Sequence, residues 1–250
     1  MRRRTWRGRP QVPPVLDPHE GWTSEASSAF AMAGFLFLVF IGFTVLAMGP
    51  LMSLDAYFNL APPPHAWVPV LHVMDRIGQR AICLPLLGLA TFWTCRRQES
   101  FRPAVVVGTS VFMLNLIVLI LKVGLGRAQP ETADPAFFSG GMAYPSGHTS
   151  NIVLVYGLMV YVLAHYGGIR RRRVAALAGL VVLLSLVMVV TSLTLNWHWF
   201  ADLIAGLLIG GMTLELTAAV DASVPQHTFS DGPRAAWAEI RGWLSHRVHP

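Results

Sequence analysis

The sequence predicts an all-α fold, a polytopic membrane bundle of about six transmembrane helices. Hydrophobic residues make up 54% of the 250 positions and charged residues only 13%, whereas soluble domains carry about 25% charged residues. Long charge-free runs recur along the chain, and most match the ~20 residues that a helix needs to cross a bilayer. Arginine clusters alternate with these runs in a pattern that predicts one orientation.

Six apolar segments account for the predicted helices. They are residues 26–54, 81–95, 103–121, 149–169, 174–195 and 199–220. The second is the shortest, and the sixth is interrupted by Asp202 and Glu215. The first begins well after Met1 and exceeds the length of a signal-peptide core, so we do not expect it to be a cleaved leader.

The arginines predict which side of the membrane each end of the bundle faces. They cluster before the first segment, between the second and third, and between the fourth and fifth, at Arg2, Arg3, Arg4, Arg7, Arg9, Arg96, Arg97, Arg102 and 170–173. With six spans these clusters share one side, which the positive-inside rule makes cytoplasmic. The net charge of +6 therefore needs no nucleic-acid partner.

The domain organisation follows from the same pattern. We expect a basic cytoplasmic tail over 1–25, a six-span membrane domain over 26–220 and a cytoplasmic tail over 221–250. Within the last tail, residues 234–248 fit either an amphipathic helix on the inner leaflet or a mobile segment.

Cysteines and small residues indicate structure rather than chemistry. Cys83 and Cys95 lie twelve positions apart on one predicted helix, about 18 Å along its axis, beyond the reach of a disulfide. Their spacing does not resemble a zinc site. Gly206 and Gly210 favour close helix packing, and Trp199 is expected to be an interfacial anchor.

Polar residues gather where three segments meet the outer side. Lys122 ends the third segment, the run Pro145-Ser146-Gly147-His148 opens the fourth, and His198 precedes the sixth. Unpaired amides at a helix start attract anions; Gly147 would let an oxyanion approach the backbone, and His148 adds a titratable group. The alternative is that Ser146 only caps the helix.

His198 and Asp202 have the spacing of a cooperating pair. Residues four apart share one side of a helix, and a carboxylate there can orient an imidazole while its second nitrogen reacts. Lys122 is the only lysine among 19 basic Lys and Arg residues. A residue that snorkels to the interface is the alternative explanation for it.

Together, Lys122, the run 145–148 and His198-Trp-Phe-Ala-Asp202 resemble the three-part signature of the type 2 phosphatidic acid phosphatase superfamily. The resemblance spans roughly residues 30–220 and implies a six-helix membrane fold with a metal-independent site near the outer surface. It implies that His198 forms a phosphohistidine, that Asp202 holds it, and that His148 protonates the leaving group and then activates water. Lys122, Ser146 and the amide of Gly147 would bind the phosphoryl oxygens.

Two arginines of the family pattern are absent. Gln129 and Ser192 stand in their places, and each charge-assisted hydrogen bond to phosphate contributes about 1.5–3 kcal/mol. We expect Arg127 to supply one cation and Gln129 a neutral hydrogen bond. Arg80 would supply another, with Arg76 one helical turn away on the same face; snorkelling or pairing with Asp75 is the alternative for both arginines.

The predicted function is that of an integral-membrane lipid-phosphate phosphatase acting at the extracytoplasmic face, with no metal and no cofactor. Its substrate would be a phosphatidate-like lipid or a polyprenyl phosphate or diphosphate. The first alternative is a lipid phosphotransferase that uses the same phosphohistidine. The second is a non-catalytic member that binds lipid, and the retained histidines argue against it. A soluble vanadium-type haloperoxidase is excluded by the six spans.

Overall fold

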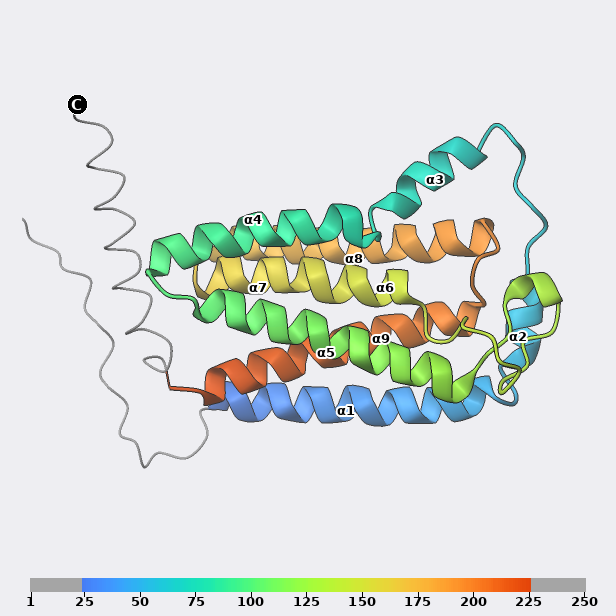
Figure 1. The fold of residues 1–250 in the computed structure, drawn as a ribbon, viewed down its shortest axis with the longest axis horizontal. Coiled ribbons are helices and arrows are strands. Elements are labelled where there is room, and N and C mark those ends of the chain that lie inside the picture. The colour runs from blue at the N-terminus through green and yellow to red at the C-terminus, as the bar shows by residue number, and fades with distance from the viewer. Residues whose placement is uncertain (1–23, 226–250) are drawn as a thin grey trace, which may run out of the picture.

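The computed structural model describes residues 24–225, drawn in colour in Figure 1. The predicted N-terminal tail and most of the predicted C-terminal tail, including 234–248, lie outside the described residues. The described part is helical throughout, with no strand.

In chain order the helices are α1 (Ser24–Ala47), α2 (Met52–Tyr57), α3 (Val68–Arg76), α4 (Arg80–Gln98), α5 (Arg102–Leu125), the 3₁₀ turn η1 (Pro130–Thr132), α6 (Gly147–Asn151), the π-helical η2 (Ile152–Tyr156), α7 (Gly157–His165), α8 (Arg171–Thr194) and α9 (Phe200–Ser223). The longest connection between the helices is the one between α5 and α6, over residues 126–146.

The long helices run side by side along the long axis of the molecule (Figure 1). Within the described residues, five segments are long and apolar enough to cross a membrane: α1, α5, the continuous run α6–η2–α7, α8 and α9. The helix α4 is not among these five; it lies alongside them and has 19 residues, with arginines at both ends. The predicted all-α membrane bundle is confirmed, and the chain is a multi-pass membrane protein.

One predicted segment boundary is wrong. The first apolar run does not continue to Leu54, because α1 ends at Ala47; Gly49 and Pro50 follow, and a proline disfavours helical geometry in the residue before it. The chain then turns into α2.

The second correction concerns Arg76 and Arg80, which do not share a helix face. Arg76 ends α3 and Arg80 begins α4. Gly78 lies in the turn between them, where an added Cβ would stand 2.8 Å from Cε of Met188 and 3.4 Å from the carbonyl oxygen of His148. The turn therefore packs closely against α6 and α8.

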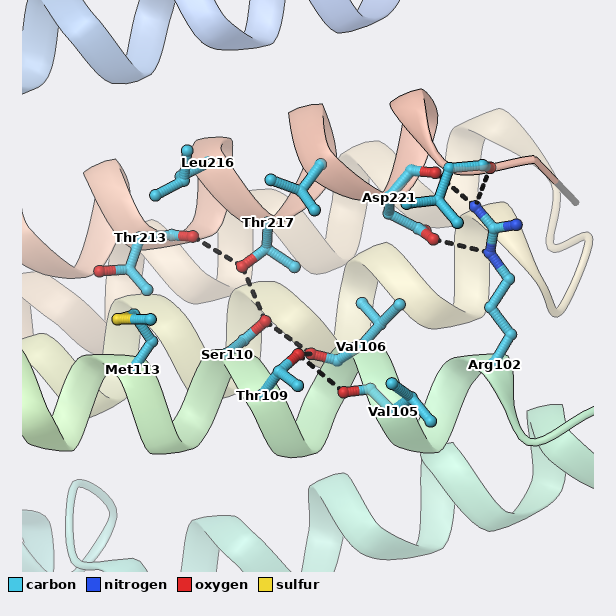
Figure 2. Close-up of a pocket in the computed structure, with 12 residues that line it drawn as sticks. Arg102, Val105, Val106, Thr109, Ser110, Met113, Thr213, Leu216, Thr217 and Asp221 are labelled. Atoms are coloured by element: carbon cyan, nitrogen blue, oxygen red, sulfur yellow. Dashed lines mark hydrogen bonds and ion pairs between the residues drawn. The ribbon is translucent and has the colours of Figure 1, made fainter. Parts of the chain in front are cut away.

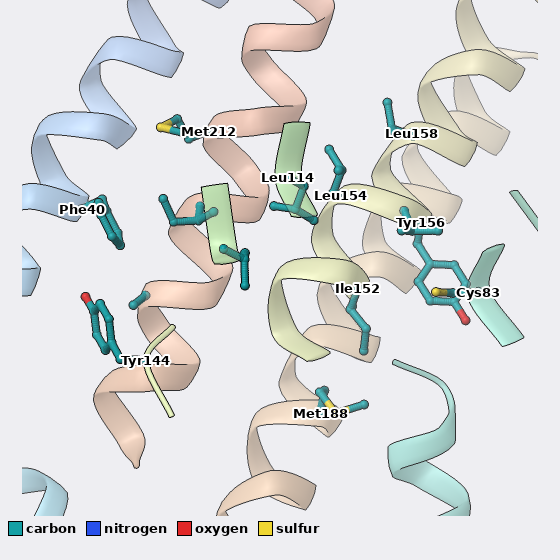
Figure 3. Packing of buried hydrophobic residues seen from close by; sticks show 14 of the residues in the cluster. Phe40, Cys83, Leu114, Tyr144, Ile152, Leu154, Tyr156, Leu158, Met188 and Met212 are labelled. Atoms are coloured by element: carbon teal, nitrogen blue, oxygen red, sulfur yellow. The ribbon is translucent and has the colours of Figure 1, made fainter. Parts of the chain in front are cut away.

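The core is built around α9, which packs against α1, α5, α6 and α8. Figure 3 shows side chains from α1 (Phe40), α5 (Leu114), η2 (Ile152), α8 (Met188) and α9 (Met212) in this core. Side chains are absent at Gly206 and Gly210, so α6 approaches α9 closely. This contact holds the start of α6 beside the start of α9.

A buried polar cluster closes the end of the bundle where α5 begins and α9 ends. The Arg102 guanidinium donates through Nε to Oδ1 of Asp221 (2.8 Å), and the hydroxyls of Tyr161 and Tyr166 donate to the other carboxylate oxygen. Figure 2 shows this pair at one end of an apolar cavity of about 330 Å³ between α5 and α9. The arginines at 96, 97 and 170–173 lie at this same end, opposite the polar residues described below.

Adding one methyl group at Gly206 is expected to destabilise the fold. A Cβ there would stand 2.0 Å from Oγ1 of Thr149 and 2.6 Å from the carbonyl oxygen of Ser146. Overpacking of this kind costs about 1–3 kcal/mol, so Gly206→Ala should unfold at a lower temperature in detergent. Gly211→Ala is the matched control, because its nearest neighbour would be Leu36 at an ordinary 3.5 Å. Equal melting temperatures for both variants would contradict the packing argument.

Candidate active site

The polar residues singled out in the sequence gather at one end of the bundle. The end of α5 brings Lys122, the start of α6 brings His148, and the residues before α9 bring His198. The connection between α5 and α6, the short α2 and the end of α3 lie at the same end (Figure 1). Segments far apart in the sequence thus contribute to one site. Asp55, for example, is hydrogen-bonded to Ala201, which lies 146 positions later in the chain.

His198 and Asp202 form the expected pair by a different route from the one predicted. His198 precedes α9, which begins at Phe200, so the two residues do not share a helix face. Asp202 instead lies in the first turn, where Oδ2 accepts a 2.9 Å hydrogen bond from the backbone N–H of Trp199. The same oxygen lies 3.4 Å from Nδ1 of His198, which leaves Nε2 of this imidazole available for chemistry.

Arg127 is fully buried and points toward carboxylates rather than into open space. Its Nη1 donates to Oδ1 of Asp202 at 2.6 Å, its Nη2 donates to Asp55, and its Nε donates to the carbonyl oxygen of Pro135 at 3.2 Å. The guanidinium carbon also lies 4.6 Å from the centre of the Phe137 ring. Arg127 thus contacts Asp202, the partner of His198. The sequence analysis predicted that Arg127 would bind phosphate.

Asp55 is a site residue that the sequence analysis missed. It lies on α2, is 1% exposed, and accepts hydrogen bonds from Arg127 and from the backbone N–H of Ala201 (2.8 Å). Burial raises the pKa of the Asp55 carboxyl, and the neighbouring Arg127 acts against that rise. The only signal in the sequence was an isolated acid just after Gly49-Pro50, at the edge of an apolar run.

Trp199 is not the interfacial anchor that the sequence predicted. It is 2% exposed, and its Nε1 donates a 2.8 Å hydrogen bond to the carbonyl oxygen of Ala128. Its ring centre lies 5.8 Å from the guanidinium carbon of Arg127. The indole therefore joins the start of α9 to the α5–α6 connection.

The start of α6 has the features of an anion site. The backbone N–H of Ser146 donates to the carbonyl oxygen of Asp202 at 2.9 Å, which ties α6 to α9. The Ser146 hydroxyl makes no capping hydrogen bond, and among the described residues its buried Oγ has no partner. A Cβ added to Gly147 would meet no atom within 4 Å, so the space beside this residue is open. Simple helix capping by Ser146 therefore does not explain the arrangement.

His148 has a carboxylate partner of its own, from α3. Its Nε2 lies 3.6 Å from Oδ2 of Asp75, whose side chain is 1% exposed. Gln79 donates a 3.0 Å hydrogen bond to this same oxygen, and within residues 24–225 the other oxygen of Asp75 has no partner. The sequence analysis considered Asp75 only as a partner for Arg76 and Arg80, and the structure pairs it with His148.

The other residues considered in the sequence analysis lie on four different segments and differ in burial. Lys122 is half-buried, donates to the carbonyl oxygen of Met142, and interacts electrostatically with Asp202 and His148. Arg80 is exposed at the start of α4 and also interacts with His148. Gln129 is exposed on the connection after α5. Ser192 is buried on α8, with its hydroxyl 3.5 Å from Sδ of Met188.

Metal-ligating side chains do not cluster in the part of the chain that the structure describes, where no group of three or more His, Cys, Asp or Glu could hold an ion. Cys83 and Cys95 are both buried on α4 and unbonded. The charged groups of the site are instead arranged as ion pairs.

Comparisons with known proteins agree with this architecture. Residues 103–222 match the model of the PAP2 superfamily. Phosphatidylglycerophosphatase B of Bacillus subtilis (strain 168) is 23% identical over 161 residues, which cover 62% of this chain and 75% of that protein. The crystal structure of a transmembrane PAP2-type phosphatidylglycerolphosphate phosphatase from Bacillus subtilis superposes with a TM-score of 0.62 at 17% identity. It covers 82% of this chain and 99% of that one.

Replacing the Asp75 carboxylate is expected to slow turnover. Asp75→Asn keeps the shape but removes the negative charge 3.6 Å from His148, and a nearby opposite charge favours the protonated form of an imidazole. We expect kcat for lipid-phosphate hydrolysis to fall by at least ~10-fold, since ~1.4 kcal/mol corresponds to a factor of ten. Asp134→Asn, on an exposed carboxylate of the α5–α6 connection, is the control. An Asp75→Asn variant as fast as its parent would show that this contact is unimportant.

Proposed function

We propose that the protein hydrolyses a phosphate ester or diphosphate of a membrane lipid through a phosphohistidine on His198. The observation that carries this proposal is that two histidines from segments far apart in the sequence lie at one end of a membrane bundle, each beside its own buried carboxylate. The match of residues 103–222 to the PAP2 superfamily model and the similarity to a phosphatidylglycerophosphatase support a lipid phosphate as the substrate.

The first step is attack of His198 on phosphorus. Asp202 accepts from the Nδ1 side of the imidazole at 3.4 Å, so the lone pair of Nε2 is available to form the P–N bond. As the bond to the leaving oxygen breaks, positive charge develops on the imidazole, and Asp202 stabilises it.

The second histidine would handle the protons. His148, held beside Asp75, donates a proton to the departing oxygen. A water molecule then attacks the phosphohistidine while His148 takes up the water proton, and the products are inorganic phosphate and regenerated His198. Such acid–base catalysis contributes about 10²–10⁴-fold.

Binding of the phosphoryl group would rest on the start of α6 and on two cations. The unpartnered hydroxyl of Ser146 and the open space beside Gly147 suit an oxyanion. Lys122 and Arg80 both interact electrostatically with His148 and would balance the charge of the bound group.

The lipid tail would extend into the bundle. An apolar cavity of about 530 Å³ lies between α4 and α5, the helices that carry Arg80 and Lys122 at their site ends. Its lining is almost wholly apolar, as the acyl or prenyl chain of a membrane lipid requires.

The proposed mechanism is tested by replacing each of the two histidines in turn. His198→Ala should abolish phosphate release from lipid phosphates presented in detergent micelles. His148→Ala should lower kcat strongly but keep substrate binding, because positioning and acid catalysis are separable. With ³²P-labelled lipid and rapid quenching, label should remain on protein that carries His198 and be absent from His198→Ala. A purified His198→Ala variant with parental turnover would overturn the mechanism. Activity is also expected to survive excess chelator.

The active site is proposed to face the extracytoplasmic side, because arginines cluster at the opposite end of the bundle. Single cysteines test this in a background where Cys83 and Cys95 are replaced by Ala. Glu131→Cys, on the exposed α5–α6 connection, should react with an impermeant maleimide on intact cells. Arg172→Cys, at the exposed start of α8, should react only after permeabilisation. The reverse pattern would move the site to the cytoplasm.

A further inference from the structure

We infer that Asp55 is a positioning residue for the nucleophile, acting on His198 through Arg127 and Asp202. The inference rests on the proposed function, because it assigns His198 the attacking role. It also replaces the predicted phosphate-binding role of Arg127 with a structural and electrostatic one.

Three successive contacts connect the side chain of Asp55 with that of His198. Asp55 accepts from Nη2 of Arg127, Nη1 of Arg127 donates to Asp202 at 2.6 Å, and Asp202 lies 3.4 Å from Nδ1 of His198. The side chains of Asp55, Arg127 and Asp202 have no exposed surface. Each contact is therefore protected from solvent screening, which weakens exposed ion pairs.

Asp55 also fixes the backbone of α9 directly. Its Oδ1 accepts the N–H of Ala201 in the first helical turn, one of the amides that have no partner inside a helix. Asp202 is the next residue and accepts the N–H of Trp199. One carboxylate on α2 thus positions both the guanidinium beside Asp202 and the helical turn that carries Asp202.

The charges explain why a second carboxylate is needed. Arg127 alone would neutralise Asp202, and the imidazole would face a pair with no net charge. With Asp55 on the same guanidinium, the three buried groups carry a net charge of −1. This charge lies beside His198 at the moment when attack on phosphorus makes the imidazole positive, so it stabilises the transition state more than the ground state.

Direct phosphate binding by Arg127 is incompatible with these contacts. Its Nε, Nη1 and Nη2 all donate to protein acceptors, and the side chain is enclosed between Phe137, Tyr144 and Trp199. Moving the guanidinium to a substrate would leave two carboxylates buried without a partner, which costs about 3–5 kcal/mol for a broken buried pair.

The test compares Asp55→Asn with Asp221→Asn in the full-length protein. Asp221 pairs with Arg102 at the opposite end of the bundle, also out of solvent, so its variant reports the cost of losing a buried carboxylate far from the site. For Asp55→Asn we expect kcat to fall at least ~30-fold while KM and the inhibition constant of inorganic phosphate change less than ~2-fold. Asp221→Asn should lower the melting temperature comparably but leave kcat unchanged.

A double-mutant cycle tests whether Asp55 acts on Asp202 through Arg127. Arg127→Met alone should lower kcat like Asp55→Asn and leave the inhibition constant of phosphate unchanged, and the double variant should be less than additive, because both changes act on Asp202. Additive losses, or a phosphate inhibition constant that rises with Arg127→Met, would overturn the inference and restore Arg127 as a phosphate ligand. A parent protein that releases no phosphate from lipid phosphates would contradict the proposed function itself.

If Asp55→Asn does not fold, Asp55→Glu keeps the charge, and partial activity of that variant at unchanged KM would support the positioning role. Unchanged kcat in any folded variant that lacks the Asp55 carboxylate would overturn it.

Discussion

The buried guanidinium of Arg127 is the interaction on which the site end of the molecule depends. A charge with no exposed surface must be paired, or the fold loses several kcal/mol. Its partners come from α2, from the α5–α6 connection and from α9, so one side chain joins three segments that the long helices bring to the same end. The aromatic rings around it exclude water and make those contacts strong.

The bundle was predictable because hydropathy is a local property. Each apolar run long enough to span a bilayer became a helix, and α4 formed alongside the others although its ends carry arginines. The histidines, Lys122 and Asp202 were selected as candidates from their spacing, and the structure brings them to one end of the bundle. The boundary at Ala47 was missed because a count of charge-free residues does not register that Gly49 and Pro50 end a helix.

The ion-pair partners were not predictable because they depend on the direction of side chains across long sequence separations. In the sequence, Asp55 is an isolated acid next to an apolar run, and Asp75 is the neighbour of Arg76. Only the turn at Gly78 brings Asp75 toward His148, and only the short α2 brings Asp55 toward Arg127. For the same reason, the sequence showed that Arg127 was near the site but not that it faces carboxylates.

The charged groups of the site are separated, with negative groups beside His198 and cations near His148. The group behind His198 is negative overall, because two carboxylates share the Arg127 guanidinium. The cations that remain to interact with His148 from α4 and α5 are Arg80 and Lys122. A phosphomonoester carries up to two negative charges, so these two would balance it even though Gln129 and Ser192 replace arginines of the family pattern. In the proposed mechanism, attack on phosphorus would move positive charge onto His198, toward the negative group, while the phosphate would stay beside the cations. Under the proposed mechanism, the absence of two arginines is compatible with phosphatase chemistry, because the site would divide its charges between holding the phosphate and stabilising the nucleophile.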